Sequence, residues 1–143
     1  MKGRLRVLVV MGMLLCAAAV LFAGGQSDST KGKQLHIGLA TRETTAPFSQ
    51  AMLLAAKQKA AELGVKLTIL SSDNDNQRHL SIMDNFITMG IDGFICGGVI
   101  DPGAIVPGVK KMNENNIPTI AIDNSPLGGK IEYFISFDIG CRS

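Results

Sequence analysis

The chain has 143 residues and a mass of 15.2 kDa, which corresponds to a single domain. Hydrophobic residues make up 46% of it and charged residues 18%, a composition too apolar for intrinsic disorder. The 14 basic and 12 acidic residues give a formal net charge of +2. Because no basic stripe accompanies this small charge, we expect no nucleic-acid partner.

The N-terminus has the layout of a secretory signal. Basic residues within the first six positions precede an apolar run over residues 7–23 that contains no charged residue. We expect residues 1–23 to be a signal peptide that is cleaved after Ala23. The polar, glycine-containing stretch over residues 24–33 then predicts a flexible linker.

Two alternatives apply to this N-terminal run. It can stay uncleaved as a membrane anchor, although it is slightly shorter than the about 20 residues that span a bilayer. It can also be lipidated at Cys16, although the two leucines before that residue are larger than such processing favours. The remaining cysteines, Cys96 and Cys141, form no CxxC motif and predict no disulfide scaffold.

The remainder of the chain alternates strand and helix patterns. A short apolar run at 35–40 predicts the first strand, and Pro47 fits the first turn of a helix that ends at Gly64. Apolar residues at helical spacing support that helix: Met52, Ala55, Ala56, Ala60 and Leu63. Residues 65–70 then alternate as a half-buried strand does.

The same unit recurs downstream. A second helical stripe is closed by Gly90 and followed by a buried strand at 91–96. The stripe consists of Leu80, Met83 and Ile87.

Asp101 and Pro102 predict the N-cap and first position of a third helix. The apolar stripe of this helix consists of Ile105, Val109 and Met112. Further strands are predicted at 117–122 and 131–137.

Strands separated by helix-length crossovers build a parallel sheet with right-handed connections. Continuous apolar strands are typical of a sheet covered on both faces. The sequence therefore predicts an α/β fold, an open doubly wound parallel sheet in a three-layer sandwich. Ligands of such sheets bind at the carboxyl ends of the strands, here the loops at 41–48, 97–101 and 123–126.

Enzyme motifs are missing from these loops. No GxGxxG follows the first strand, and Gly128-Gly129-Lys130 lacks the other residues of a P-loop. His36 and His79 have no catalytic partner by sequence, so structural or surface roles are favoured. We expect no enzyme activity, no metal and no cofactor; a flavodoxin-like enzyme is the alternative that a flavin spectrum would revive.

A series of short segments, none specific alone, carries a resemblance through its order and spacing. The segments are Thr44–Phe48, Ala55–Ala56, Ala60–Gly64, Ser72–Asp75, Gly90–Gly93, Asp101–Pro102, Asn116–Thr119 and Ile122–Asp123. With them, residues 35–138 closely resemble the first lobe of the periplasmic sugar-binding proteins of the ribose/galactose type. These are the substrate-capture components of bacterial ABC importers.

The resemblance implies roles for individual residues. Phe48 would stack on the apolar face of a sugar ring, and Asp123 would accept hydrogen bonds from neighbouring sugar hydroxyls. Asn124 stands where the family often has Arg or Lys, and Arg42 would serve the cleft from the first loop. Ala46 replaces a polar residue that is usual in the family, so one hydroxyl contact is lost.

The resemblance also implies partners and location. Residues 34–138 would form the N-terminal lobe, bind a monosaccharide such as ribose or galactose, and deliver it to the membrane permease of an ABC importer. The protein would be exported to the periplasm or the outer face of the cytoplasmic membrane. A cytoplasmic repressor with the same lobes would instead need a helix-turn-helix where this chain has a signal.

Residues 139–143 diverge from the family, whose members continue into a hinge and a second lobe. We therefore expect a truncated form with weak or no sugar binding. The alternative is a membrane-tethered half-receptor that acts as a sensor or interaction module.

Overall fold

The computed structural model describes residues 33–136, so the predicted signal peptide, most of the linker and the divergent tail lie outside the described residues. Strands and helices alternate along the described chain. They are β1 (His36–Thr41), α2 (Pro47–Leu63), β2 (Lys66–Ser71), α3 (Asn76–Thr88), β3 (Gly93–Gly97), α4 (Val106–Glu114), β4 (Thr119–Ile122) and β5 (Tyr133–Ile135).

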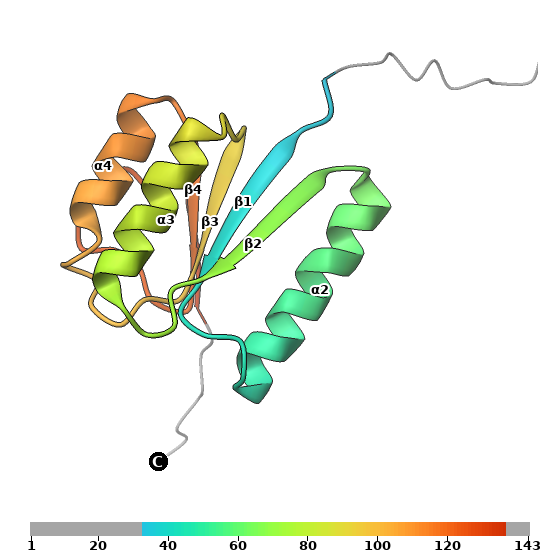
Figure 1. Ribbon diagram of the computed structural model, residues 1–143, viewed down its shortest axis with the longest axis horizontal. Helices are drawn as coiled ribbons and strands as arrows, with labels where there is room; N and C mark the ends of the chain where they lie inside the picture. The colour runs from blue at the N-terminus through green and yellow to red at the C-terminus, as the bar shows by residue number, and fades with distance from the viewer. Residues whose placement is uncertain (1–32, 137–143) are drawn as a thin grey trace, which may run out of the picture. The chain divides into compact units, whose positions relative to one another are not determined.

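All five described strands join one parallel sheet in the order β2-β1-β3-β4-β5. Helix α2 lies on one face of this sheet, and α3 and α4 lie on the other (Figure 1). The predicted α/β fold with a parallel sheet and helices on both faces is therefore confirmed. The three-layer arrangement follows from right-handed crossovers, since the crossover from β1 to β2 moves along the sheet in one direction and the crossover from β2 to β3 moves in the other.

Local sequence signals explain where α2 and α3 begin and end. Helix α2 starts at Pro47, which has no amide hydrogen to leave unsatisfied, and stops before Gly64, whose φ of 66° suits a residue without a side chain. Helix α3 begins after Asp75, whose carboxylate accepts a hydrogen bond of 2.8 Å from the amide of Arg78.

The predicted start of the third helix at Pro102 is wrong, because α4 begins at Val106. The carboxylate of Asp101 accepts hydrogen bonds from the amides of Gly103 (2.8 Å) and Ala104 (3.2 Å), which closes a separate turn. Pro107 lies in the first turn of α4 and has no amide hydrogen to give to the carbonyl of Gly103. Regular helical hydrogen bonding therefore does not reach back to Asp101.

The hydrophobic core lies between the sheet and the α3/α4 layer. Phe86 from α3 and Phe94 from β3 are fully buried, with ring centroids 5.9 Å apart at 53°, a tilted contact that aromatic pairs favour. Met83 and Met112 are also inaccessible to solvent and fill the space between the two helices and the strands. This layer is closely packed over β1, β3 and β4.

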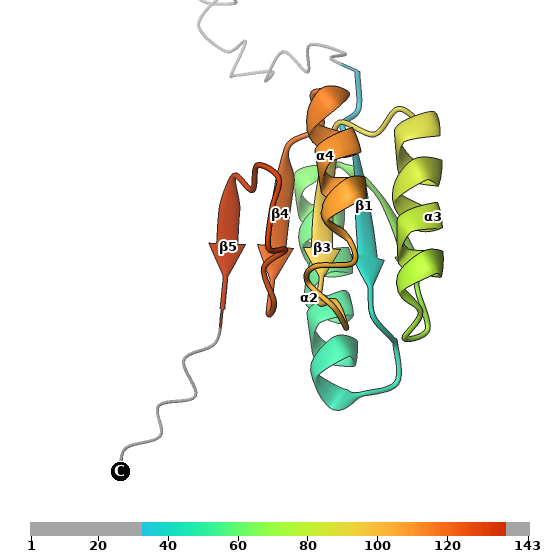
Figure 2. The same ribbon diagram turned by 90° about the vertical axis from the view of Figure 1, so that its left-hand side faces the viewer.

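The opposite face is less covered, because α2 is the one helix of residues 33–136 that lies on it. A groove of about 660 Å³ runs beside α2, and its floor includes Ile37, Ile95 and Ile122, which are only half-buried although they belong to inner strands. Figure 2 shows β5 at the edge of the sheet. The three residues of β5 are all exposed, Tyr133 by 71%.

The loop between β4 and β5 is docked on α4 and provides a test of this packing. Gly129 has a φ of 87°, and a Cβ atom there would lie 2.5 Å from Cγ1 of Val109. We expect Gly129→Ala to lower the free energy of unfolding by about 2 kcal/mol or more, because left-handed strain of about 1 kcal/mol adds to the clash. Urea unfolding followed by circular dichroism measures this.

Gly64→Ala is the matched control. Its φ of 66° is similarly left-handed, but no atom lies within 4 Å of the added Cβ. Equal losses of stability in the two variants would show that the contact with Val109 does not restrict this loop.

Candidate functional site

The topology places the site at the carboxyl ends of β1 and β3. These strands pair directly, with Thr41 opposite Gly97 at their ends, and the strand order reverses between them. The loop after β1 leads to α2 on one face, whereas the loop after β3 leads to α4 on the other. Open α/β sheets bind ligands where two neighbouring loops diverge in this way, and the loops after β1, β3 and β4 are called the rim below.

Phe48 and Asp123 both belong to this edge of the sheet. Phe48 is the second residue of α2 and is 42% exposed, and it lines the same groove as Ile122, the residue before Asp123. Asp123 is exposed, and its amide donates a 2.9 Å hydrogen bond to the carbonyl oxygen of Ile135. The structure therefore brings these two predicted site residues to one rim.

The backbone of Asp123 has an unusual conformation. Its φ of 75° lies in the left-handed region, which Asp tolerates better than most residues. A Cβ atom added to Gly98 would lie 3.7 Å from Oδ2 of Asp123, so the carboxylate approaches the backbone just after β3. The Asp123 carboxylate thus lies near the ends of both β3 and β4.

Asn124 and Arg42 both form hydrogen bonds with neighbouring loops. The amide group of Asn124 donates a 3.1 Å hydrogen bond to the carbonyl oxygen of Val99, which ties the loop after β4 to the loop after β3. Arg42 is half-buried, and its carbonyl oxygen accepts a 2.9 Å hydrogen bond from the amide of Asn74. Their predicted contact with a ligand stays a prediction.

Glu43 was not identified from the sequence. Its carboxylate accepts hydrogen bonds from the amides of Thr45 and Ala46 and from the hydroxyls of Thr45 and Ser49. These donors, with that of Ser49 first, lower the pKa of Glu43 to about 2, since they favour the charged form. The available signal was a helix start with Ala46 at the cap position and Pro47 after it, which leaves the first turn without a side-chain acceptor.

A buried polar cluster contacts the end of β1, next to the rim. The Ser72 hydroxyl lies 3.3 Å from the carbonyl oxygen of Thr41 and 3.4 Å from Nδ1 of His79. Nε2 of His79 lies 3.9 Å from Sγ of Cys96. Burial lowers the pKa of His79 to about 4 and raises the pKa of Cys96 to about 12, so both side chains are neutral near pH 7.

Neither His79 nor Cys96 is reachable by a substrate, because both are buried within the core. The structural role predicted for His79 agrees with this position. Among residues 33–136, no three His, Cys, Asp or Glu side chains come together in a way that would hold a metal ion. Within the same range, no helix combines the length and apolar character needed to cross a membrane.

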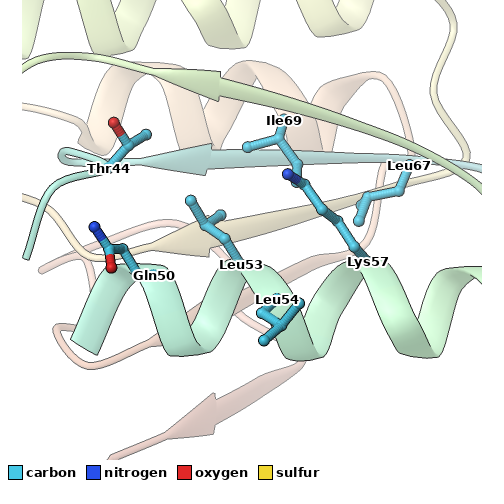
Figure 3. A pocket seen from close by; sticks show the side chains of 7 residues that line it. All are labelled: Thr44, Gln50, Leu53, Leu54, Lys57, Leu67 and Ile69. Carbon is cyan, nitrogen blue, oxygen red and sulfur yellow. The ribbon is translucent and has the colours of Figure 1, made fainter. Parts of the chain in front are cut away.

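A second groove, of about 620 Å³, lies on the other side of α2, next to β2. Figure 3 shows Leu53 and Lys57 of α2 directed toward the strands, beside Leu67 and Ile69. The lining of this second groove combines aliphatic side chains with Thr44, Gln50 and Lys57, but the groove lies beside the edge strand β2 and not where the strand order reverses. The rim therefore remains the better candidate site.

The fold is an open α/β lobe with a candidate site at the carboxyl edge of its sheet, and comparison with known proteins identifies its family. Residues 37–139 match the profile of the periplasmic binding protein domain. The match covers most of the chain, so the chain belongs to the periplasmic binding protein family.

Curated relatives agree with this assignment. The chain is 26% identical over 141 residues to the ribose import binding protein RbsB of Bacillus subtilis, a match that covers 96% of this chain and 46% of the relative. It is 27% identical over 128 residues to the RbsB of Haemophilus influenzae, covering 90% of this chain and 44% of that protein. The chain thus spans less than half the length of these relatives.

Solved structures share the fold. The Caulobacter myo-inositol binding protein superposes with a TM-score of 0.66 at 23% identity, covering 71% of this chain and 35% of that one. A solute binding protein of an ABC transporter from Clostridium phytofermentans, solved with bound β-D-glucose, gives a TM-score of 0.67 at 17% identity, covering 72% and 32% of the two chains. At these identities the likeness establishes the fold.

The buried histidine predicts how stability depends on pH. The pKa of His79 falls from 6.5 to about 4 on folding, so the unfolded chain binds the proton more tightly. The corresponding stability is present above pH 6.5 and is lost as the pH falls toward 4. We expect the free energy of unfolding to drop by on the order of 3 kcal/mol across this range, measured by urea unfolding at a series of pH values.

His79→Gln should remove most of this slope. His36→Gln is the comparison: His36 lies at the other end of β1 and bonds to Thr68, and burial also lowers its pKa, so this variant should remove a smaller part of the slope. If the dependence of stability on pH survives in His79→Gln but disappears in His36→Gln, the assignment of this titration to His79 is wrong.

Proposed function

We propose that this chain forms the first lobe of an exported sugar-binding protein that serves an ABC importer. In this proposal the lobe captures a monosaccharide such as ribose or galactose at the carboxyl edge of its sheet, and a membrane permease receives it. The observation that carries the proposal is the exposed Asp123 carboxylate on the same rim as Phe48, in a member of the periplasmic binding protein family. Its place of action is the periplasm or the outer face of the cytoplasmic membrane.

The two residues would supply complementary chemistry. A sugar ring has an apolar C–H face and a polar perimeter of hydroxyls. The Phe48 ring would cover the apolar face, whereas the ionised Asp123, which can only accept, would take hydrogen bonds from adjacent hydroxyls. Asn124 and Arg42 flank these positions and would contact the remaining hydroxyls.

The same geometry limits how tightly the lobe alone can bind. Asp123 is exposed in the described structure, so its carboxylate is hydrated before a ligand arrives. Each sugar hydroxyl then exchanges one hydrogen bond to water for one to protein, and the net gain is about 1 kcal/mol. A few such contacts give an affinity near the millimolar range, about 4 kcal/mol.

We therefore expect purified 143-residue protein to bind ribose or galactose with a dissociation constant of about a millimolar or weaker. Asp123→Asn, which keeps a side chain that tolerates the left-handed backbone, should weaken this binding about fivefold through the loss of charge-assisted hydrogen bonds. Chemical-shift titration by NMR, with ribose, galactose, glucose, xylose and arabinose, is suited to such affinities.

Asp84→Asn provides the control, because Asp84 is an exposed acidic residue on α3 that pairs with Lys111. A micromolar constant for any of these sugars would contradict the expected weakness of one lobe. Equal affinities of the Asp123→Asn and unmodified proteins would remove Asp123 from the site.

A further inference from the structure

The start of α2 has an unusual arrangement of hydrogen bonds. Its cap position is Ala46, which offers no side-chain acceptor, and Pro47 follows without an amide hydrogen. Ser, Thr, Asp or Asn normally supplies the acceptor at such a position. Here no side chain caps the helix; Glu43, three residues before the cap position, instead accepts from the amides of Thr45 and Ala46, just before α2, and from the Ser49 hydroxyl in its first turn.

Four hydrogen bonds converge on the Glu43 carboxylate. Oε2 accepts from the amide of Thr45 (2.6 Å), the hydroxyl of Thr45 (2.9 Å) and the amide of Ala46 (2.8 Å). Oε1 accepts from the hydroxyl of Ser49 (2.5 Å). One side chain thereby connects the loop after β1 with the first turn of α2.

The backbone of Glu43 is itself fixed to the sheet. The hydroxyl of Thr41, the last residue of β1, donates a 2.9 Å hydrogen bond to the carbonyl oxygen of Glu43. Thr41 is fully buried and is bonded into the sheet between β2 and β3. A continuous series of hydrogen bonds therefore runs from β1 through Glu43 to Ser49.

Phe48 lies between the residues that this series holds. Ala46 before it and Ser49 after it both donate to the same carboxylate. The position of the Phe48 ring at the rim thus depends on the shape of the loop and not only on packing in the groove.

We propose that Glu43 is a positioning residue for the ligand site, which holds the loop over residues 43–49 in one shape so that Phe48 is presented at the rim before a ligand arrives. This inference rests on the proposed function, because Phe48 is assigned there to the sugar ring. Binding then costs less loop ordering, which is the general benefit of preorganisation. The low pKa of Glu43 supports a carboxylate that stays charged throughout the physiological range.

A consequence distinguishes positioning by a charge from ordinary packing. Removing the Glu43 side chain leaves the amide and hydroxyl donors of the loop aimed at an empty position beside a helix N-terminus, where a small anion is favoured. In Glu43→Ala, acetate should therefore replace the lost carboxylate. Unmodified protein already holds a carboxylate there and should not respond.

The first experiment follows hydrogen exchange of the Thr45 and Ala46 amides by NMR, with and without sodium acetate and with sodium chloride at equal ionic strength. We expect exchange at least about tenfold faster in Glu43→Ala, since these amides lose a charged acceptor, and recovery with acetate. Glu62→Ala is the matched control, because Glu62 is an exposed residue of α2 whose partner is Lys59. Unchanged exchange in Glu43→Ala, or recovery with chloride as well as acetate, would overturn the proposal.

The second experiment measures ribose affinity by chemical-shift titration in the same proteins. Glu43→Ala should weaken binding several-fold, and acetate should restore it. In Phe48→Ala, the further change Glu43→Ala should weaken binding much less, because the ring that Glu43 positions has been removed. Unchanged ribose affinity in Glu43→Ala would overturn the positioning role while leaving the proposed function intact.

The two failures are separable. If unmodified protein binds no sugar while acetate still restores amide protection in Glu43→Ala, the proposed function fails. The loop is then ordered by Glu43 as described, but this order does not serve a sugar site. If sugar binds to unmodified protein but the exchange result is absent, only the role of Glu43 is wrong.

Discussion

The pairing of β1 with two parallel neighbours is the constraint on which the rest of the structure depends. Because β2 lies on one side of β1 and β3 on the other, the chain must cross one face of the sheet after β1 and the opposite face before and after β3. The loops that follow β1 and β3 therefore separate at the carboxyl edge. Thr41 and Gly97, paired at the strand ends, mark the point from which the two loops separate.

The two faces of the sheet contribute unequally to stability. On the α3/α4 face, Phe86, Phe94 and Met83 exclude solvent completely, so the full hydrophobic contribution of their side chains is realised. On the α2 face, Ile95 and Ile122 remain half-buried beside a groove of about 660 Å³. The apolar strand sequences correctly predict that both faces of the sheet are apolar. They do not predict how much of a face a single helix covers.

Much of the fold was predictable because its signals are local. Pro47 and Gly64 bound α2 through backbone restrictions that act within a single residue, and apolar runs mark the strands directly. The start of α4 and the role of Glu43 were not predictable in this way. Asp101 suits a helix cap by residue type, yet whether a helix follows depends on the hydrogen bonding around Pro107. Glu43 accepts from the amide of Ala46, the cap residue itself, and no usual capping pattern predicts an acceptor three residues before the cap. The rim positions of Phe48 and Asp123 followed from parallel topology, whereas contact with a sugar depends on chemistry that no local pattern encodes.

The two sides of the rim are held by different means, and this difference bears on how a ligand would be recognised. On the α2 side, a charged acceptor with four short hydrogen bonds fixes the loop beside Phe48. On the β4 side, Asp123 adopts a left-handed conformation and its amide bonds to Ile135, in a three-residue edge strand that is largely exposed. Edge strands open more readily than inner ones, because fewer buried contacts oppose the opening. If Glu43 positions Phe48 as proposed, the aromatic surface is preformed. The Asp123 carboxylate, which would select among sugar hydroxyls, depends instead on the most exposed strand of the sheet. Any contact that stabilises β5 would therefore also order Asp123.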